Sequence, residues 1–204
     1  MFLRLAGCNL QCVDGPKLAR ELRGREIDVG FFCDTDFAKG ERMTLDAIRC
    51  QLAEAWPDEG RAVVISGGEP ALQVDSALVA GLQEDGWYVA IETNGTIDNP
   101  AFQQADWISC SPKGRTELKM ADEVRFVLEP GNAPDDRGLV GRPPNGKLHR
   151  FVSPRFESTV ADFVADFDHP KAPDRDAMAW AVHWCLLNPR WRLSVQQHKL
   201  WGVE

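Results

Sequence analysis

The chain has 204 residues, of which 44% are hydrophobic and 26% charged, and it lacks the run of roughly eighteen apolar residues that a membrane span needs. This length predicts one domain with a substantial core. The net charge of -8 argues against general affinity for nucleic acid or anionic lipid, because like charges repel. Six cysteines are too few for a disulfide scaffold and no signal peptide precedes Cys8, so a cytoplasmic location is expected.

Short β-rich runs alternate with helical stretches, which is typical of an α/β fold with a mostly parallel sheet. Seven strands are predicted, at Phe2–Ala6, Arg61–Ser66, Trp87–Glu92, Trp107–Ser111, Val124–Leu128, His149–Ser153 and Trp191–Val195. Three helices are predicted, at Thr44–Trp56, Ala71–Asp85 and Asp174–Leu187. The first has Thr44 as its N-cap and one apolar stripe, made of Leu45, Ile48, Leu52 and Trp56. The aperiodic stretch Pro130–Lys147 is predicted to be a long surface loop.

Polar and special residues follow every predicted strand. Cys8 follows the first, and the later strand ends carry SGGEP (66–70), ETNG (92–95), SPK (111–113), LEP (128–130), VSP (152–154) and QQHK (196–199). The carboxyl ends of parallel strands open on one face, where such folds bind ligands and react. The sequence therefore predicts a binding or active site at that face.

Three cysteines, Cys8, Cys12 and Cys33, stand among glycines and polar residues in an irregular stretch, which does not fit a core position. Two interpretations remain open. Structural zinc sites prefer four ligands, whereas an iron-sulfur cluster can use three thiolates and leave one iron open. The remaining cysteines are interpreted as small core residues: Cys50, Cys110 and Cys185.

The SGGEP run adds a second signal. Two glycines after a strand let the backbone approach a ligand closely and expose its N–H and C=O groups. Such a pair is weak evidence alone, because most glycine pairs are only turns. Here the pair stands after the strand that follows the cysteine loop, and this combination is a far more specific sign of a binding site than either part alone.

Six segments together carry a resemblance: RLAGCNL, FCDTDF, SGGEPALQ, IETNGT, SPK and SVQQHK. They resemble the radical S-adenosylmethionine enzymes and, more narrowly, the 7-carboxy-7-deazaguanine synthase family, over nearly the whole chain. The resemblance implies an incomplete (β/α) barrel of the radical SAM type, with a 4Fe-4S cluster, S-adenosyl-L-methionine and Mg²⁺. It implies a lyase that converts 6-carboxy-5,6,7,8-tetrahydropterin to 7-carboxy-7-deazaguanine and ammonia in queuosine and 7-deazapurine biosynthesis. An electron donor such as flavodoxin or ferredoxin and a homodimer are also implied.

The resemblance also implies roles for individual residues. The cluster ligands would be Cys8, Cys12 and Cys33, and Thr35 would contact Mg²⁺. The cofactor would be contacted by Phe32, Cys33, Asp34, Gly68, Glu69, Ser111, Pro112, Lys113 and Ser153. The substrate would be contacted by Arg4, Ser66, Glu92, His198 and Glu204. Three histidines are predicted to be structural or exposed: His149, His169 and His183.

The chain departs from the family pattern in two places. Twenty residues, from Val13 to Phe32, separate the second and third cysteines, where the common spacing is two. Some relatives carry their second cysteine where Gly30 stands, and glycine cannot ligate iron, so the resemblance assigns Cys12. An insertion at about 13–32 is therefore expected to leave the cluster loop and return to it. The chain is also expected to lack a first strand and a pterin-binding turn, unless its start is misplaced.

Two other interpretations remain. Another small radical SAM enzyme, such as a glycyl-radical activase, would share the cysteines and GGEP but would not need ETNG or QQHK. A non-catalytic iron-sulfur or zinc protein belongs to a different class.

Overall fold

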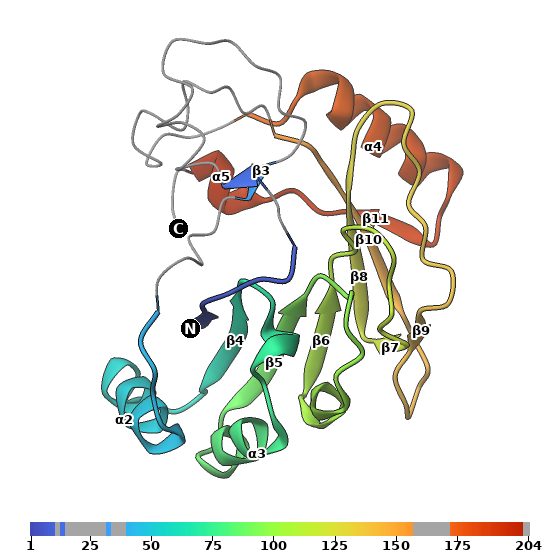
Figure 1. The fold of residues 1–204 in the computed structure, drawn as a ribbon. Coiled ribbons are helices and arrows are strands. Elements are labelled where there is room, and N and C mark those ends of the chain that lie inside the picture. The colour runs from blue at the N-terminus through green and yellow to red at the C-terminus, as the bar shows by residue number, and fades with distance from the viewer. Residues whose placement is uncertain (11–12, 15–31, 34–39, 157–171, 202–204) are drawn as a thin grey trace. The chain divides into compact units, whose positions relative to one another are not determined.

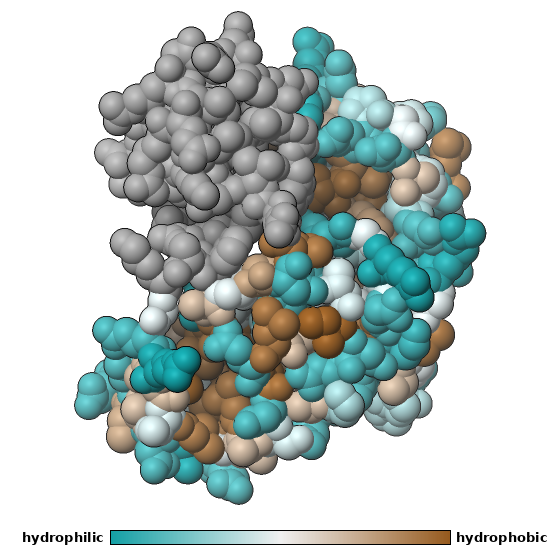
Figure 2. All heavy atoms as spheres, viewed as in Figure 1, coloured by the Kyte–Doolittle hydropathy of each residue, from teal (hydrophilic) through white to brown (hydrophobic). Residues whose placement is uncertain are grey.

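The computed structural model describes residues 1–10, 13–14, 32–33, 40–156 and 172–201 (Figure 1). In these ranges, every helix is too short or too polar to cross a membrane. Hydrophobic and hydrophilic residues are interspersed on the face shown in Figure 2.

Seven strands form one sheet in the order β1-β4-β5-β6-β8-β10-β11. They are β1 (Phe2–Leu5), β4 (Ala62–Gly67), β5 (Tyr88–Thr93), β6 (Trp107–Cys110), β8 (Glu123–Leu128), β10 (His149–Pro154) and β11 (Trp191–Leu193). The pairings β1–β4, β4–β5, β5–β6, β6–β8 and β10–β11 are all parallel. All seven predicted strands are confirmed, and each end lies within two residues of its predicted place. The predicted α/β class is confirmed as well.

Two short parallel pairs accompany the main sheet. One joins β2 (Val13–Asp14) to β3 (Phe32–Cys33), and the other joins β7 (Met120–Ala121) to β9 (Val140–Gly141). Strand β9 interrupts the stretch that was predicted to be a loop throughout. Its backbone pairs with the segment before β8, which a search for side-chain periodicity cannot detect.

Three predicted helices are confirmed as α2 (Leu45–Ala55), α3 (Ser76–Glu84) and α4 (Arg175–Leu187). Thr44 caps α2 as predicted, because its hydroxyl accepts a hydrogen bond from the amide of Ala47 at 3.2 Å. Of the predicted stripe on α2, only Leu52 is buried. Trp56 is exposed because the helix ends before it and Trp56 is the C-cap. Cys50 is also exposed, so its predicted core position is wrong.

The second helix begins at Ser76 and not at Ala71, as the sequence had predicted. Asp75 accepts a hydrogen bond from the amide of Leu78 at 2.8 Å and so caps a new helix. The residues before it form a separate 3-10 turn, η1 (Pro70–Leu72). Two further helices were not predicted, η2 (Pro100–Gln104) and α5 (Gln197–Trp201).

The chain folds into two compact units. Unit 1 comprises Met1–Asn9, Thr35–Val124 and Arg137–His149; unit 2 comprises Leu10–Asp34, Arg125–Asp136 and Arg150–Glu204. Strands β8 and β10 each contribute residues to both units. The predicted single domain stays a prediction.

In unit 1, one face of the sheet forms the core. Helix α3 packs against β5 and η2, and the side chains on this face are fully buried: Val63, Ile65, Val89, Ile91 and Ile108. On the opposite face, three residues that alternate with them are half-buried or exposed: Val64, Ala90 and Glu92. This second face is therefore available to carry a site. In unit 2, α4 packs against β11 and buries Ala177 and Ala181.

Arg142 ties the loop before β10 to the sheet of unit 1. Its guanidinium contacts the Asp122 carboxylate at 2.7 Å and donates to the carbonyls of Gln103 and Ala105, both at 2.8 Å. Asp122 in turn accepts from the amide of Ile108 in β6 at 2.8 Å. The Arg142 side chain thus makes three polar contacts beside the core.

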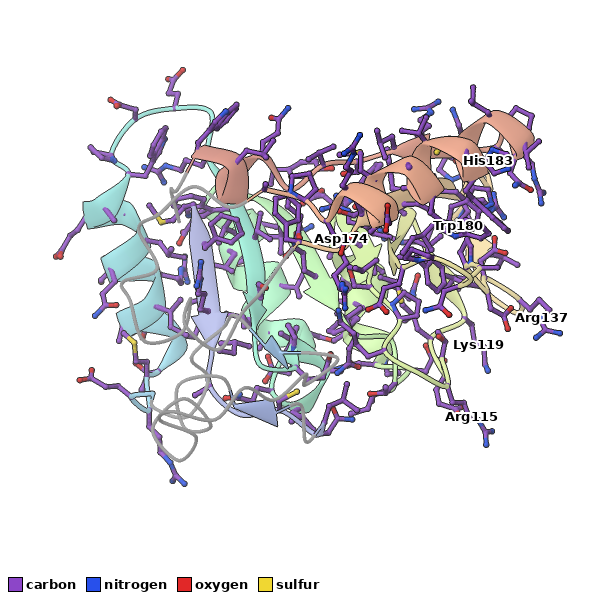
Figure 3. The ribbon with its side chains drawn as sticks, turned by 90° about the horizontal axis from the view of Figure 1, so that it is seen from above. Arg115, Lys119, Arg137, Asp174, Trp180 and His183 are labelled. Carbon is purple, nitrogen blue, oxygen red and sulfur yellow. The ribbon has the colours of Figure 1, made fainter. Side chains whose placement is uncertain are left out.

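We expect Arg142→Ala to lower the free energy of unfolding by about 2 kcal/mol, because it removes a charged donor and leaves Asp122 and two carbonyls without it. Urea unfolding measures this change. The matched control is Arg115→Ala. Arg115 points outward (Figure 3), its side chain is 88% exposed, and its salt bridge to Glu117 should contribute under about 0.5 kcal/mol. Equal losses in both variants would contradict the role given to Arg142.

Candidate active site

The loops after β1 and β4 are joined backbone to backbone. The amide of Gly68 donates to the carbonyl of Leu5 at 2.8 Å, and the amide of Glu69 donates to that of Gly7 at 2.9 Å. A Cβ atom on Gly68 would lie only 1.8 Å from the Gly7 oxygen, so no larger residue fits. Gly68 thus approaches the loop that carries Cys8, and the predicted approach of the glycine pair to a ligand stays a prediction.

Glu69 is fully buried, and its carboxylate joins the loop after β4 to the loop after β5. One oxygen accepts from the Thr93 hydroxyl at 2.6 Å and from the Ala71 amide at 2.9 Å. The other accepts from the Asn94 amide at 2.8 Å. These three donors hold the carboxylate between the two loops, and the predicted contact of Glu69 with a cofactor stays a prediction.

Asn9, next to Cys8, completes this set of joined loops. Its side-chain amide donates to the Thr96 hydroxyl at 2.8 Å and accepts from the side chain of Asn94 at 3.2 Å. The Thr96 hydroxyl donates to the Asn94 side chain at 2.7 Å. Cys8 itself is half-buried. Sequence analysis did not single out Asn9, and its position beside a predicted ligand was the only signal.

Three predicted substrate residues lie in one row across neighbouring strands. Arg4 in β1 is the register partner of Ser66 in β4. The Ser66 hydroxyl donates to the Glu92 carboxylate in β5 at 3.4 Å. Arg4 and Glu92 are exposed and Ser66 is half-buried. The structure thus brings a cation, a hydroxyl and an anion together on the face of the sheet opposite the core.

The row continues over two more strands with residues that sequence analysis missed. Glu92 is the register partner of Ser109 in β6, and Ser109 is the partner of Glu123 in β8. The Ser109 hydroxyl donates to the Glu123 carboxylate at 2.7 Å. Finding this pair requires the strand register, because no motif contains either residue.

The other predicted cofactor residues occupy two places. Ser111, Pro112 and Lys113 follow β6 in unit 1, where the amide of Ser111 donates to the carbonyl of Thr93 at 2.8 Å. Ser153 lies in β10, in unit 2, and is 1% exposed. Among the described residues, the Ser153 hydroxyl has no hydrogen-bond partner. A buried hydroxyl without a partner is costly, so Ser153 has a hydrogen bond to offer a bound group, and its predicted cofactor role stays a prediction.

Several predictions fall on residues that cannot be placed. Cys12, Asp34, Thr35, His169 and Glu204 lie outside the described residues, and only the backbone is described for Phe32, Cys33 and His198. In the part that is described, no group of three or more His, Cys, Asp or Glu side chains could hold a metal ion. The roles predicted for these residues stay predictions.

The backbone does describe both ends of the predicted insertion. Val13 pairs with Phe32 and Asp14 pairs with Cys33. The two ends of the predicted insertion therefore lie side by side. Its excursion from a cluster loop and the ligand roles of Cys12 and Cys33 stay predictions.

The structure describes the environments of four other cysteines and histidines. Cys110 is buried as predicted and Cys185 is half-buried. His149 stacks on Trp107 with ring centres 5.6 Å apart, and His183 lies exposed on α4 near Trp180 (Figure 3), which confirms the structural or exposed roles predicted for both.

Cysteine reactivity should follow these environments. Burial, with a smaller effect of the Glu69 carboxylate, raises the pKa of Cys110 to about 12. At pH 8 only about one Cys110 thiol in ten thousand is then ionised, and the thiolate is the reactive form. We expect iodoacetamide to modify exposed Cys50 but not Cys110 at pH 8, with Cys110 labelling rising about tenfold per pH unit while the fold holds. Peptide mass spectrometry measures both sites, and equal labelling would contradict this assignment.

Comparisons with known proteins agree on one family. No family model matches the chain. A 7-carboxy-7-deazaguanine synthase from Caulobacter vibrioides is 36% identical over 219 residues, which cover 100% of this chain and 89% of the relative. The proteins of the same name from Burkholderia multivorans and Bradyrhizobium diazoefficiens are 35% and 34% identical, with the same coverage. The crystal structure of QueE from Escherichia coli matches with a TM-score of 0.58 and 18% identity, over 96% of this chain and 84% of that one.

The parallel sheet with its helices defines an α/β protein, in agreement with the fold of the solved structure. Identity above 30% over the whole chain identifies the family more narrowly. The chain belongs to the 7-carboxy-7-deazaguanine synthase family. The resemblance seen in the sequence is thereby confirmed.

Proposed function

We propose that this chain is a radical SAM lyase that converts 6-carboxy-5,6,7,8-tetrahydropterin to 7-carboxy-7-deazaguanine with release of ammonia. The observation that carries the proposal is similarity over the full chain to proteins named for this product. The row of Arg4, Ser66 and Glu92 gives it local support.

The row suits a ligand with an anionic group at one end and N–H donors at the other. Arg4 and Glu92 lie two strands apart, about 10 Å across the sheet. A guanidinium can bind a carboxylate through two parallel hydrogen bonds, and the Glu92 carboxylate can accept from the guanidine-like edge of a pterin. Arg4 and Glu92 would therefore fix the direction in which the substrate lies.

The cofactors would be held by the residues at the strand ends. Cys8, Cys12 and Cys33 would bind the 4Fe-4S cluster, whose irons take thiolate ligands. S-adenosyl-L-methionine would contact Phe32, Cys33, Asp34, Gly68, Glu69, Ser111, Pro112, Lys113 and Ser153. Thr35 would offer a hydroxyl to Mg²⁺, which prefers oxygen ligands. When bound, the cluster and S-adenosyl-L-methionine supply the one-electron chemistry, and the protein supplies orientation and shelter from water.

His198 and Glu204 would complete the substrate contacts. We further propose a cytoplasmic homodimer that receives electrons from a flavodoxin or ferredoxin and works in queuosine or 7-deazapurine biosynthesis. These points follow from family membership, which supports them without placing a partner on this chain.

Anaerobic reconstitution with iron and sulfide tests the enzyme class. We expect about four irons per chain and reductive cleavage of S-adenosyl-L-methionine. One bound zinc without cleavage would favour a structural metal protein. Cleavage that depends on a partner protein and not on the pterin would favour a glycyl-radical activase.

A further inference from the structure

The pair Ser109–Glu123 extends the substrate row but has no part in the function proposed above. Both residues are nearly buried, with 7% and 9% of their surface exposed. Ser109 is the register partner of Glu92 on one side and of Glu123 on the other. The three side chains therefore lie on the same face of the sheet at the same level, because partners in a parallel register project to one side.

The hydrogen bond within the pair determines what Ser109 can offer a ligand. A serine hydroxyl has one proton and two lone pairs. Ser109 donates its proton to Glu123 at 2.7 Å, so toward Glu92 it can only accept. Glu92 already accepts from Ser66 at 3.4 Å. Two neighbouring strands, about 4.8 Å apart, thus present acceptors side by side.

A purely structural role does not account for this pair well. Burying a carboxylate is costly even when it is hydrogen-bonded, and an apolar pair of similar size would often be as stable or more so. Ser109 also lies on the strand next to Glu92, on the same face of the sheet. Adjacent acceptors are complementary to a ligand edge with adjacent N–H donors, such as the ring N–H and amino group of a pterin.

We propose that Ser109, with its proton held by Glu123, is a second hydrogen-bond acceptor beside Glu92 and that it selects substrates by their amino-bearing edge. Glu123 is a positioning residue, since it acts through Ser109. The inference rests on the proposed function for the identity of the substrate class.

The test is ligand selectivity, measured by anaerobic calorimetry on the full, reconstituted chain. The two probes are 6-carboxy-5,6,7,8-tetrahydropterin and its analogue with a 2-oxo group in place of the 2-amino group. The wild-type protein should prefer the amino compound, because the oxo group would place an acceptor against acceptors. The double variant Ser109→Ala/Glu123→Leu should lose about tenfold of this preference, the effect of about one hydrogen bond.

Binding of S-adenosyl-L-methionine by the double variant should not change, which separates a loss of selectivity from a loss of the fold. Ser109→Ala alone should show the same loss of preference, and Glu84→Ala, exposed on α3, should show none. A double variant that keeps the wild-type preference would overturn the inference and leave the proposed function standing. A wild-type chain that turns over no pterin would instead overturn the proposed function.

Discussion

Replacing Glu69 with alanine should lower the free energy of unfolding by about 3 kcal/mol or more. The change leaves the Thr93 hydroxyl and the amides of Ala71 and Asn94 without their acceptor inside the protein. Each buried donor without a partner costs about 1 to 3 kcal/mol, and bonds to a charged group are the stronger ones. Urea or thermal unfolding of the apo protein measures the loss, independent of any cluster.

Glu69→Gln provides the graded comparison. The amide can still accept from Thr93 and Ala71, but its NH₂ group would face the Asn94 amide, which also donates. We expect a loss between those of the wild type and of the alanine variant. Glu84→Ala, on the solvent side of α3, controls for the loss of a carboxylate. If Glu69→Ala unfolds like this control, Glu69 does not join the loops as the hydrogen bonds indicate.

Replacing any one of Cys8, Cys12 or Cys33 with alanine should abolish the visible absorbance of the reconstituted cluster and the cleavage of S-adenosyl-L-methionine. A three-thiolate site has no spare ligand. Among them, Cys12→Ala is the most informative, because the long insertion after Cys12 departs from the family's cysteine spacing. Apo stability should change little in Cys8→Ala, since the thiol is only half-buried.

Cys50→Ala is the matched control for these variants. Its thiol is exposed on α2, away from the strand-end loops. Absorbance, iron content and cleavage should all equal those of the wild type. Full iron content and cleavage in Cys12→Ala would reject Cys12 as a ligand.

Much of the fold could be predicted because the residue pattern of the strands and the capping residues of the helices indicated the same elements. Strands β4 and β5 alternate buried and open residues, and the caps of α2 and α4 are Thr44 and Asp174, residue types that favour the N-cap position. The start of α3 was misjudged because Pro70–Leu72 continues the apolar pattern, while Asp75 begins a new helix with its own cap. A search for apolar periodicity does not detect a break between two helices when the apolar pattern continues across it.

For the site, the motifs predicted individual residues but not how those residues are arranged. Arg4, Ser66 and Glu92 were each identified from the family motifs, but their placement in one row depends on register, which is a property of strand pairing. Ser109 and Glu123 became visible only through that register. The motif predicted a cofactor contact for Glu69, which stays a prediction, but it did not predict that the carboxylate joins two loops, because burial and hydrogen bonding cannot be read from a motif.

The most direct test of the whole account is mass spectrometry of the products formed by the wild-type chain. The reconstituted protein would receive 6-carboxy-5,6,7,8-tetrahydropterin, S-adenosyl-L-methionine, Mg²⁺ and a reductant under anaerobic conditions. We predict 7-carboxy-7-deazaguanine together with an equal amount of ammonia. Cleavage of S-adenosyl-L-methionine with the pterin left unchanged would contradict the account.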